Sequence, residues 1–216
     1  MKPPLLPYRI WTILLPVIAA ILIRWFWIFP FSVTDNNLTP HLVKGDIIAV
    51  DQMAEWTRGD YLVYKNPLIE GWNPLSAGKC KALPGDTLYL YMTWQQNNKP
   101  QNRLLPFIIP RKGIPVKVEP WTTHLLSNAL FLYEGRNICQ QCDSILVVNG
   151  IPLNSVTFTQ DYIWISSSGK NDSATGSTAF GLLPASMVVG KVKWKTLESS
   201  KNKKPFFSRL FQAIDK

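Results

Sequence analysis

Apolar residues dominate the chain from Trp11 to Phe31, where the only charged residue is Arg24. A run of about 20 residues is long enough to cross a hydrocarbon core of about 30 Å. It exceeds the apolar region of a typical secretory signal, so we expect residues 10–31 to be retained as a transmembrane anchor. Lys2 and Arg9 predict that residues 1–9 are cytoplasmic and that the chain after the anchor is exoplasmic. A buried helix of a soluble domain is disfavoured because the run has no polar face.

Short apolar segments follow the anchor, and their composition is typical of β-strands. They are rich in β-branched and aromatic residues and are separated by Gly-Asp, Pro-Gly and Asn-Gly turns. The predicted strands are 47–50, 61–64, 88–92, 145–148, 162–165 and 187–192. Between Glu119 and Glu134, apolar residues recur at helical intervals after a threonine, which predicts one helix. The pattern predicts an all-β fold, an antiparallel barrel or sandwich, with this helix inserted.

The net charge of +9 draws attention to the C-terminal tail, residues 198–216. It combines cations with apolar residues at helical spacing: Lys201, Lys203, Lys204, Arg209, Phe206, Phe207, Leu210, Phe211 and Ile214. A basic amphipathic tail is attracted to anionic lipid and could lie flat on the bilayer. Packing on the body of the protein or on a partner is an equal alternative. Nucleic acid is excluded as a partner because an exoplasmic domain does not meet it.

Two of the three cysteines, Cys139 and Cys142, form a C-x-x-C pair between strand-like runs. In an oxidising compartment we expect a disulfide that closes this tight loop. A redox role is the alternative, but thioredoxin-type dithiols begin a helix, whereas this pair leads into a predicted strand. Cys80, His41 and His124 lack the spacing of zinc ligands relative to the pair. We therefore expect neither a metal nor a cofactor.

Residues 36–50 read NNLTPHLVKGDIIAV. This segment, called the box below, resembles the nucleophile box of bacterial signal peptidase I, G-S-M-x-P-T-L-x-x-G-D-x-I-x-V. The resemblance implies a serine-lysine peptidase in which that serine attacks the scissile carbonyl. Asn37 stands at the serine position here, and an amide is not a nucleophile.

Three further segments occur in the order of the same family. RGDYLVYK (58–65) is similar to R-G-D-[IV]-V-[VA]-F, and GKCKALPGD (78–86) is similar to K-R-x-[VI]-G-L-P-G-D. The third segment lies within 180–191, where FGLLP and VGK are similar to W-G-F-V-P and I-x-G-K. The resemblance implies the signal peptidase I fold. It places the β core in residues 32–92 and 160–197, and an inserted subdomain in residues 93–159.

The resemblance also implies a lysine base six residues before the proline of L-P-G-D, and that position is Gly78. Lys79 is adjacent, but successive strand residues point to opposite faces. We therefore expect Lys79 to face away from the groove and Cys80 to share the face of Gly78. A bulge at Gly78 that re-aims Lys79 is the alternative. Gly176 and Thr178 stand where the family has a bracing aspartate and arginine.

The sequence thus predicts a signal peptidase-like protein without an intact serine-lysine pair. We expect it to reside in the bacterial inner membrane with a periplasmic domain, to contact membrane lipid, and to bind an exported polypeptide or a partner in an envelope complex. The candidate peptide-binding residues are Asn37, Leu38, Thr39, Pro40, His41, Gly78 and Cys80. Two alternatives are an active signal peptidase with displaced catalytic groups, such as Cys80 or His41, and a purely structural envelope subunit.

Overall fold

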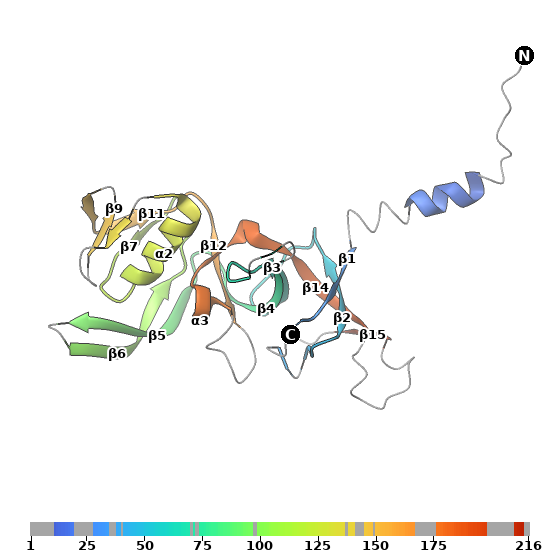
Figure 1. Ribbon diagram of the computed structural model, residues 1–216, viewed down its shortest axis with the longest axis horizontal. Helices are drawn as coiled ribbons and strands as arrows, with labels where there is room; N and C mark the ends of the chain where they lie inside the picture. Colours follow the sequence, from blue (N-terminus) through green and yellow to red (C-terminus); the bar gives the residue numbers. More distant parts are fainter. Residues whose placement is uncertain are drawn as a thin grey trace, which may run out of the picture.

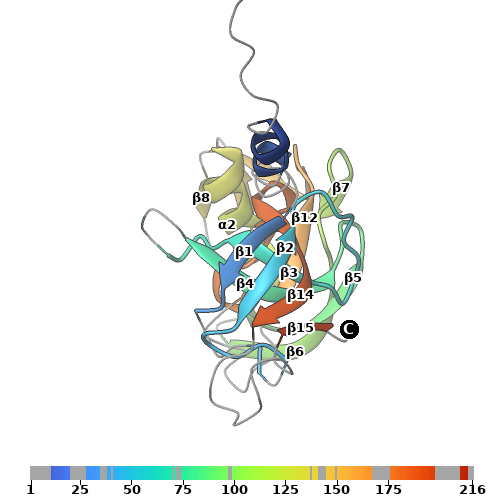
Figure 2. The same cartoon turned by 90° about the vertical axis from the view of Figure 1, so that its right-hand side faces the viewer.

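The computed structural model describes residues 11–19, 28–34, 38–39, 41–69, 71, 74–96, 99–136, 138–140, 145–148, 150–166, 176–197 and 210–213. Among them, eight strands form one curled antiparallel sheet in the order β1-β2-β14-β3-β4-β12-β13, with β15 paired to β14 (Figures 1 and 2). Their bounds are β1 Ile28–Ser32, β2 Ile47–Asp51, β3 Tyr61–Lys65, β4 Leu75–Ala82, β12 Tyr162–Ser166, β13 Leu183–Pro184, β14 Val188–Leu197 and β15 Leu210–Ala213. The sheet resembles half of a barrel, which confirms the predicted all-β class.

The remaining described strands form smaller sheets around one helix, on the left in Figure 1. They are β5 Thr87–Gln96 with β6 Lys99–Ile108, β7 Pro115–Lys117 with β11 Ser155–Thr157, and β8 Ile138–Gln140 with β9 Leu146–Val148 and β10 Ile151–Leu153. The helices are α2 Thr123–Glu134, α3 Ser177–Phe180 and the 3-10 turn η1 Ala185–Met187. The boundary expected at residues 92 and 93 falls inside β5, whose pairing with β6 already begins at Thr87.

The inserted helix is confirmed, although it begins later than its apolar pattern suggested. Thr122 is its N-cap residue, but the Thr122 hydroxyl makes no cap hydrogen bond. Its Oγ1 instead accepts a hydrogen bond from the Glu119 amide and donates one to the Glu119 carbonyl oxygen. The threonine therefore closes the turn before the helix, and residues 119–121 remain outside α2.

Buried apolar side chains form separate clusters on the two sides of the large sheet. One cluster lies under the box and contains Leu38, Leu42, Tyr61 and Val63, with Ala77 packed against it. A second cluster lies on the opposite side of β3 and β4 and is formed by Leu62, Tyr64, Cys80, Ile163, Ile165, Phe180 and Leu183. The two strands therefore carry apolar side chains on both faces, and the face of each β4 residue decides which cluster it meets.

One type of turn occurs three times around the sheet. Gly45, Gly59 and Gly85 have φ values of 94°, 91° and 90°, a region that favours glycine. The carboxylate of the aspartate after each glycine accepts a hydrogen bond from the amide three residues before that aspartate. Each carboxylate also pairs with a cation: Asp46 with Lys195 at 3.0 Å, Asp60 with Lys191 at 2.7 Å and Asp86 with Arg58 at 2.6 Å. Strand β14 thus fixes the turn inside the box that precedes β2 and the turn that precedes β3.

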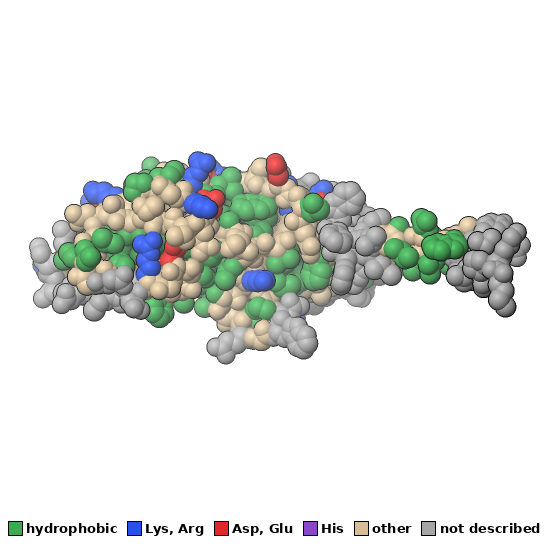
Figure 3. Space-filling view, turned by 90° about the horizontal axis from the view of Figure 1, so that it is seen from above, with side chains coloured by type: hydrophobic (Ala, Val, Ile, Leu, Met, Phe, Trp, Pro, Cys, Tyr) green, Lys and Arg blue, Asp and Glu red, His purple; other side chains and the backbone are tan. Residues whose placement is uncertain are grey.

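The two ends of the chain differ in part from the sequence predictions. Residues 11–19 are helical with exposed apolar side chains, seen at the right of Figure 3, and no helix in the described ranges is long and apolar enough to cross a membrane. The predicted anchor end at residue 31 is wrong, because Ile28–Ser32 is strand β1 and pairs with β2. The helical conformation suggested by the apolar spacing of the tail is also wrong for Leu210–Ala213, because this segment is strand β15 and pairs with β14. For that segment the alternative of packing on the protein's own body is confirmed.

Candidate functional site

Successive residues of β4 point alternately to a closed face, where side chains are buried, and to a half-open face, where they are partly exposed. Its even-numbered residues are buried, and Gly78 has so little space that an added Cβ would overlap Ile165 Cγ2 and lie 3.2 Å from Tyr64 Cε1. Its odd-numbered residues, Leu75, Ala77 and Lys79, are half-buried, and the first two pack against the cluster under the box. The side of β4 that faces the box is therefore the side that carries Lys79.

This arrangement corrects the expected orientation of the strand. Lys79 was expected to face away from the groove, but its ammonium lies 5.3 Å from the centroid of the Tyr61 ring. Tyr61 belongs to the cluster under the box, and its ring is 5.9 Å from that of His41. The reason is steric: Ile165 and Tyr64 leave no room for a side chain at Gly78, so the long side chain at position 79 occupies the half-open side.

Polar side chains form a row across three strands on this side. Tyr61 on β3 is the cross-strand partner of Lys79 on β4, and Lys79 is the partner of Ser166 on β12. His41 of the box packs on Tyr61 at one end of the row. The Tyr61 hydroxyl is buried and has no hydrogen-bond partner among the described residues, and burial raises the pKa of this group. The row supplies hydrogen-bond donors beside the box, on the face of β4 opposite to the one that encloses Gly78.

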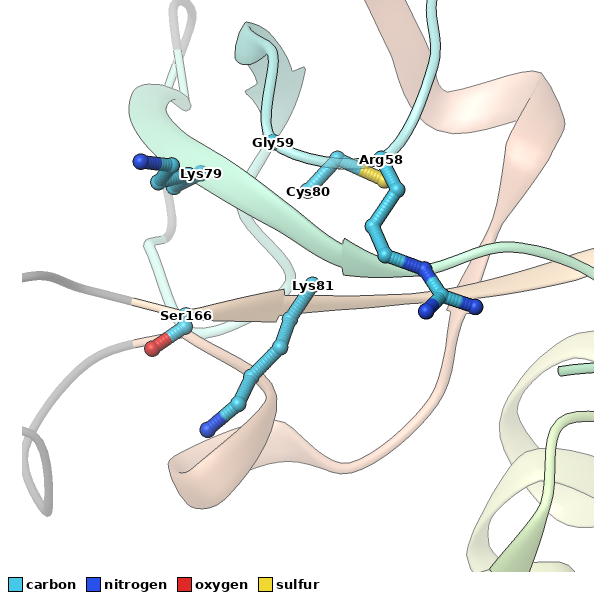
Figure 4. A pocket seen from close by; sticks show the side chains of 6 residues that line it. All are labelled: Arg58, Gly59, Lys79, Cys80, Lys81 and Ser166. Atoms are coloured by element: carbon cyan, nitrogen blue, oxygen red, sulfur yellow. The ribbon is translucent and has the colours of Figure 1, made fainter. Parts of the chain in front are cut away.

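A pocket of about 310 Å³ opens at the β12 end of this row. It is lined by Arg58, Gly59, Lys79, Cys80, Lys81 and Ser166. Figure 4 shows the Lys81 ammonium and the Ser166 hydroxyl at the lower left, the Lys79 ammonium at the upper left and the Arg58 guanidinium on the right. Because Arg58 pairs with Asp86, the two lysines are the lining cations that do not form an ion pair with a carboxylate in the described residues.

Cys80 is not suited to nucleophilic chemistry. Its side chain is 1% exposed and its thiol donates to the Ala82 carbonyl oxygen at 3.8 Å. Burial, aided by the carboxylates of Asp60 and Asp86, raises the pKa of the thiol to about 12. The thiolate is the reactive form of cysteine, so this environment suppresses its reactivity. The structure gives no support to a displaced cysteine nucleophile.

The box itself is described only in part. Asn37 and Pro40 lie outside the described residues, as does Cys142 of the C-x-x-C pair. Leu38 is buried and its carbonyl accepts a hydrogen bond from the Leu42 amide, which forms a tight turn around the half-buried Thr39. The peptide-binding role of the box residues, Gly78 and Cys80, and the disulfide remain predictions.

The segment expected to brace the site is organised differently from the family pattern. Gly176 has a φ of 77° and precedes the short helix α3. Ser177, between the two expected bracing positions, is buried and its Oγ accepts a hydrogen bond from the Ile165 amide at 2.9 Å. Thr178 is exposed. The Ser177 hydroxyl of α3 thus fixes β12, the strand that borders the pocket.

Sequence reasoning did not single out Tyr61 or Ser166 as site residues. Tyr61 was read only as part of a strand, because aromatic residues are common in strands. Ser166 directly follows the apolar run of β12, and its position opposite Lys79 depends on a register shift between Trp164 and Ile165. A shift of this kind leaves no signal in one sequence. In the described residues no group of three or more His, Cys, Asp or Glu side chains could hold a metal ion.

Comparison with known families agrees with the residues that form this site. The family described as "Signal peptidase, peptidase S26" matches residues 8–106, a range that includes the box, the RGD strand β3 and the whole of β4. No curated protein matches the chain. The matched range ends before β12, so the family match does not cover Ser166 or the segment around Gly176. Residues 8–106 are thus similar to the signal peptidase S26 family.

Proposed function

We propose that this signal peptidase-like protein binds an extended polypeptide between the box and β4 and does not cleave it. The observation that carries the proposal is the closed face at Gly78, where even a Cβ would overlap Ile165. A lysine base cannot occupy the position that the family resemblance assigns to it. Asn37 at the serine position removes the attacking oxygen as well.

The edge of β4 supports binding in an extended conformation. Residues Leu75 to Gly78 pair with β3 on one side. Within the described residues, β12 pairs with β4 only at Lys79, Cys80 and Ala82. Among the described residues, the second edge of Leu75–Gly78 therefore has no strand partner, and this edge lies next to the cluster under the box. A peptide that adds a strand there gains main-chain hydrogen bonds and side-chain pockets without any catalytic chemistry.

The membrane setting is part of the same proposal. The apolar run before β1 would anchor the protein, and the β domain would lie on the exoplasmic side, where exported polypeptides are the available ligands. Alkaline carbonate extraction and protease protection of oriented vesicles test this arrangement. Release by carbonate, or protection of the domain in spheroplasts, would contradict it.

Site-specific photo-crosslinking tests the peptide-binding proposal. A photo-reactive residue at His41 or Ala77 is expected to capture a polypeptide in native membranes, because both positions border the proposed groove. The same residue at Lys112, which is exposed on a turn of the insertion, is the control and is expected to capture nothing. Capture only through the insertion, with silent groove positions, would support the structural-subunit alternative.

An active hydrolase is the second candidate, and one observation favours it. Lys79 and Ser166 are cross-strand partners that line the same pocket. In this scheme the Lys79 amine takes the hydroxyl proton as Ser166 Oγ bonds to the scissile carbonyl carbon, and this proton passes to the leaving amine. Water then hydrolyses the acyl-serine ester, which releases the acyl group and restores the Ser166 hydroxyl. Cleavage of an Ala-x-Ala substrate, lost in Ser166→Ala but kept in Ser186→Ala, would establish the hydrolase and overturn the binding proposal.

A further inference from the structure

We propose that the pocket beside Lys79 and Lys81 binds a carboxylate of the polypeptide in the groove. This inference rests on the proposed function and specifies the chemistry of the ligand. The carboxylate is either that of an acidic side chain or that of a C-terminus, since both present the same two oxygens to the pocket.

The charges of the lining residues support an anionic ligand. The described residues that line the pocket include three basic side chains and no acidic one. Asp86 neutralises Arg58, whereas Lys79 and Lys81 form no ion pair with a carboxylate among the described residues. Lys79 is held by the Tyr61 ring, which fixes the direction of its ammonium. The Lys81 ammonium ends near the Ser166 hydroxyl, whereas the Lys79 ammonium lies farther away on the same side of the view (Figure 4). All three groups can donate hydrogen bonds.

The position of the pocket selects a polypeptide as the source of the anion. In the part of the chain that the structure describes, the edge of β4 without a strand partner ends at Gly78, and the pocket begins at the next residue, where Ser166 pairs with Lys79. A strand added to Leu75–Gly78 continues the line of β12, so the part of the peptide that reaches Gly78 lies beside the pocket. A volume of about 310 Å³ suits a side chain or a chain terminus.

Peptide pairs that differ in one charged group test the inference on the full chain in neutral phosphatidylcholine nanodiscs. Short extended peptides are compared with Glu or Gln at each position in turn, and with a free or an amidated C-terminus, by fluorescence anisotropy. The expected result is a preference of about 10-fold for one carboxylate, equivalent to about 1.4 kcal/mol. The preference is expected to fall close to 1 in Lys79→Met and Lys81→Met. Lys112→Met removes one charge elsewhere and is expected to keep it.

The outcomes separate this inference from the proposed function. If peptides bind but acid and amide forms bind equally, the carboxylate site is wrong and the peptide groove stands. If no peptide binds, the proposed function fails first. If Lys79→Met and Lys81→Met reduce binding to phosphatidylglycerol vesicles without changing peptide preference, the ligand is a lipid phosphate and the inference is overturned. Binding through the carboxylate is also expected to weaken as the ligand is protonated below about pH 4.

Discussion

Tyr61 and Lys79 are cross-strand partners, and the Lys79 ammonium lies 5.3 Å from the centroid of the Tyr61 ring. Tyr61 is 3% exposed and contacts His41 with the same ring, so it links the box to the strand that carries the lysine. Cation–π contact of this kind contributes about 0.5–1 kcal/mol at exposed sites and more when desolvated. The pair keeps the lysine against β3, on the side of the sheet where the box packs.

The buried Tyr61 hydroxyl has no hydrogen-bond partner in the described part of the chain, which makes Tyr61→Phe informative. An unpaired buried hydroxyl costs about 1–3 kcal/mol, so its removal is expected to raise the free energy of unfolding by about 1 kcal/mol. Urea denaturation measures the change. Tyr162→Phe is the matched control: its hydroxyl contacts Glu134 and Gln160, each at 3.4 Å, and its loss is expected to destabilise the protein. A destabilised Tyr61→Phe protein would show that the hydroxyl has a partner after all.

The ion pair between Asp46 and Lys195 is buried, with side-chain exposures of 0% and 9%. Lys195→Met would leave the Asp46 carboxylate buried without its cation, and we expect a loss of about 3–5 kcal/mol in the free energy of unfolding. Lys193→Met breaks an ion pair whose lysine is 41% exposed, so this control is expected to lose about 0–1 kcal/mol. Both are measured by urea denaturation. Equal losses in the two variants would show that the Asp46 pair gains nothing from burial.

Cys80 is expected to resist alkylation in the folded protein. Because burial and nearby carboxylates raise the pKa of its thiol to about 12, almost no thiolate forms at about pH 8. Iodoacetamide followed by peptide mass spectrometry should find Cys80 unmodified under native conditions and fully modified in urea. Rapid native modification, still present in Lys79→Met, would indicate an open and reactive thiol and would revive the cysteine alternative.

The sequence alone was sufficient for the all-β fold class, because the strands depend on local patterns. The strands over 47–50, 61–64 and 162–165 were predicted by β-branched and aromatic runs and were found as β2, β3 and β12. Glycine-aspartate turns were predicted for a local reason too, since Gly45 and Gly59 need positive φ.

The side of the sheet to which each β4 side chain points could not be predicted in the same way. Spacing from L-P-G-D placed Gly78 toward the groove, whereas the side chains of Tyr64 and Ile165 decide which residues of β4 are enclosed. Those contacts come from two other strands, and one of them carries a register shift. The row from His41 through Tyr61 and Lys79 to Ser166 is therefore a tertiary feature that requires the strand pairing.

The double substitution Asn37→Ser with Gly78→Lys restores the residue types of the family pair, yet we expect no peptidase activity from it. A lysine at position 78 starts with a Cβ that overlaps Ile165, so it must displace β12 or point into the closed cluster. Overpacking of this kind costs about 1–3 kcal/mol, and displacement of about 1 Å near a reacting centre can cost about 100-fold in rate. Cleavage of an Ala-x-Ala peptide and urea denaturation are measured together.

The control for this experiment is Asn37→Ser alone, which leaves β4 unchanged. If residue 37 faces the row of His41, Tyr61, Lys79 and Ser166, the new serine hydroxyl lies on the side that carries Lys79. If Asn37→Ser gains activity that disappears in Asn37→Ser with Lys79→Met, Lys79 is the base and position 78 is irrelevant, as the closed face at Gly78 requires. If instead the double variant with Gly78→Lys is both stable and active, the side chain of Ile165 moves aside at little cost in free energy. The closed face would then no longer argue against a lysine at position 78.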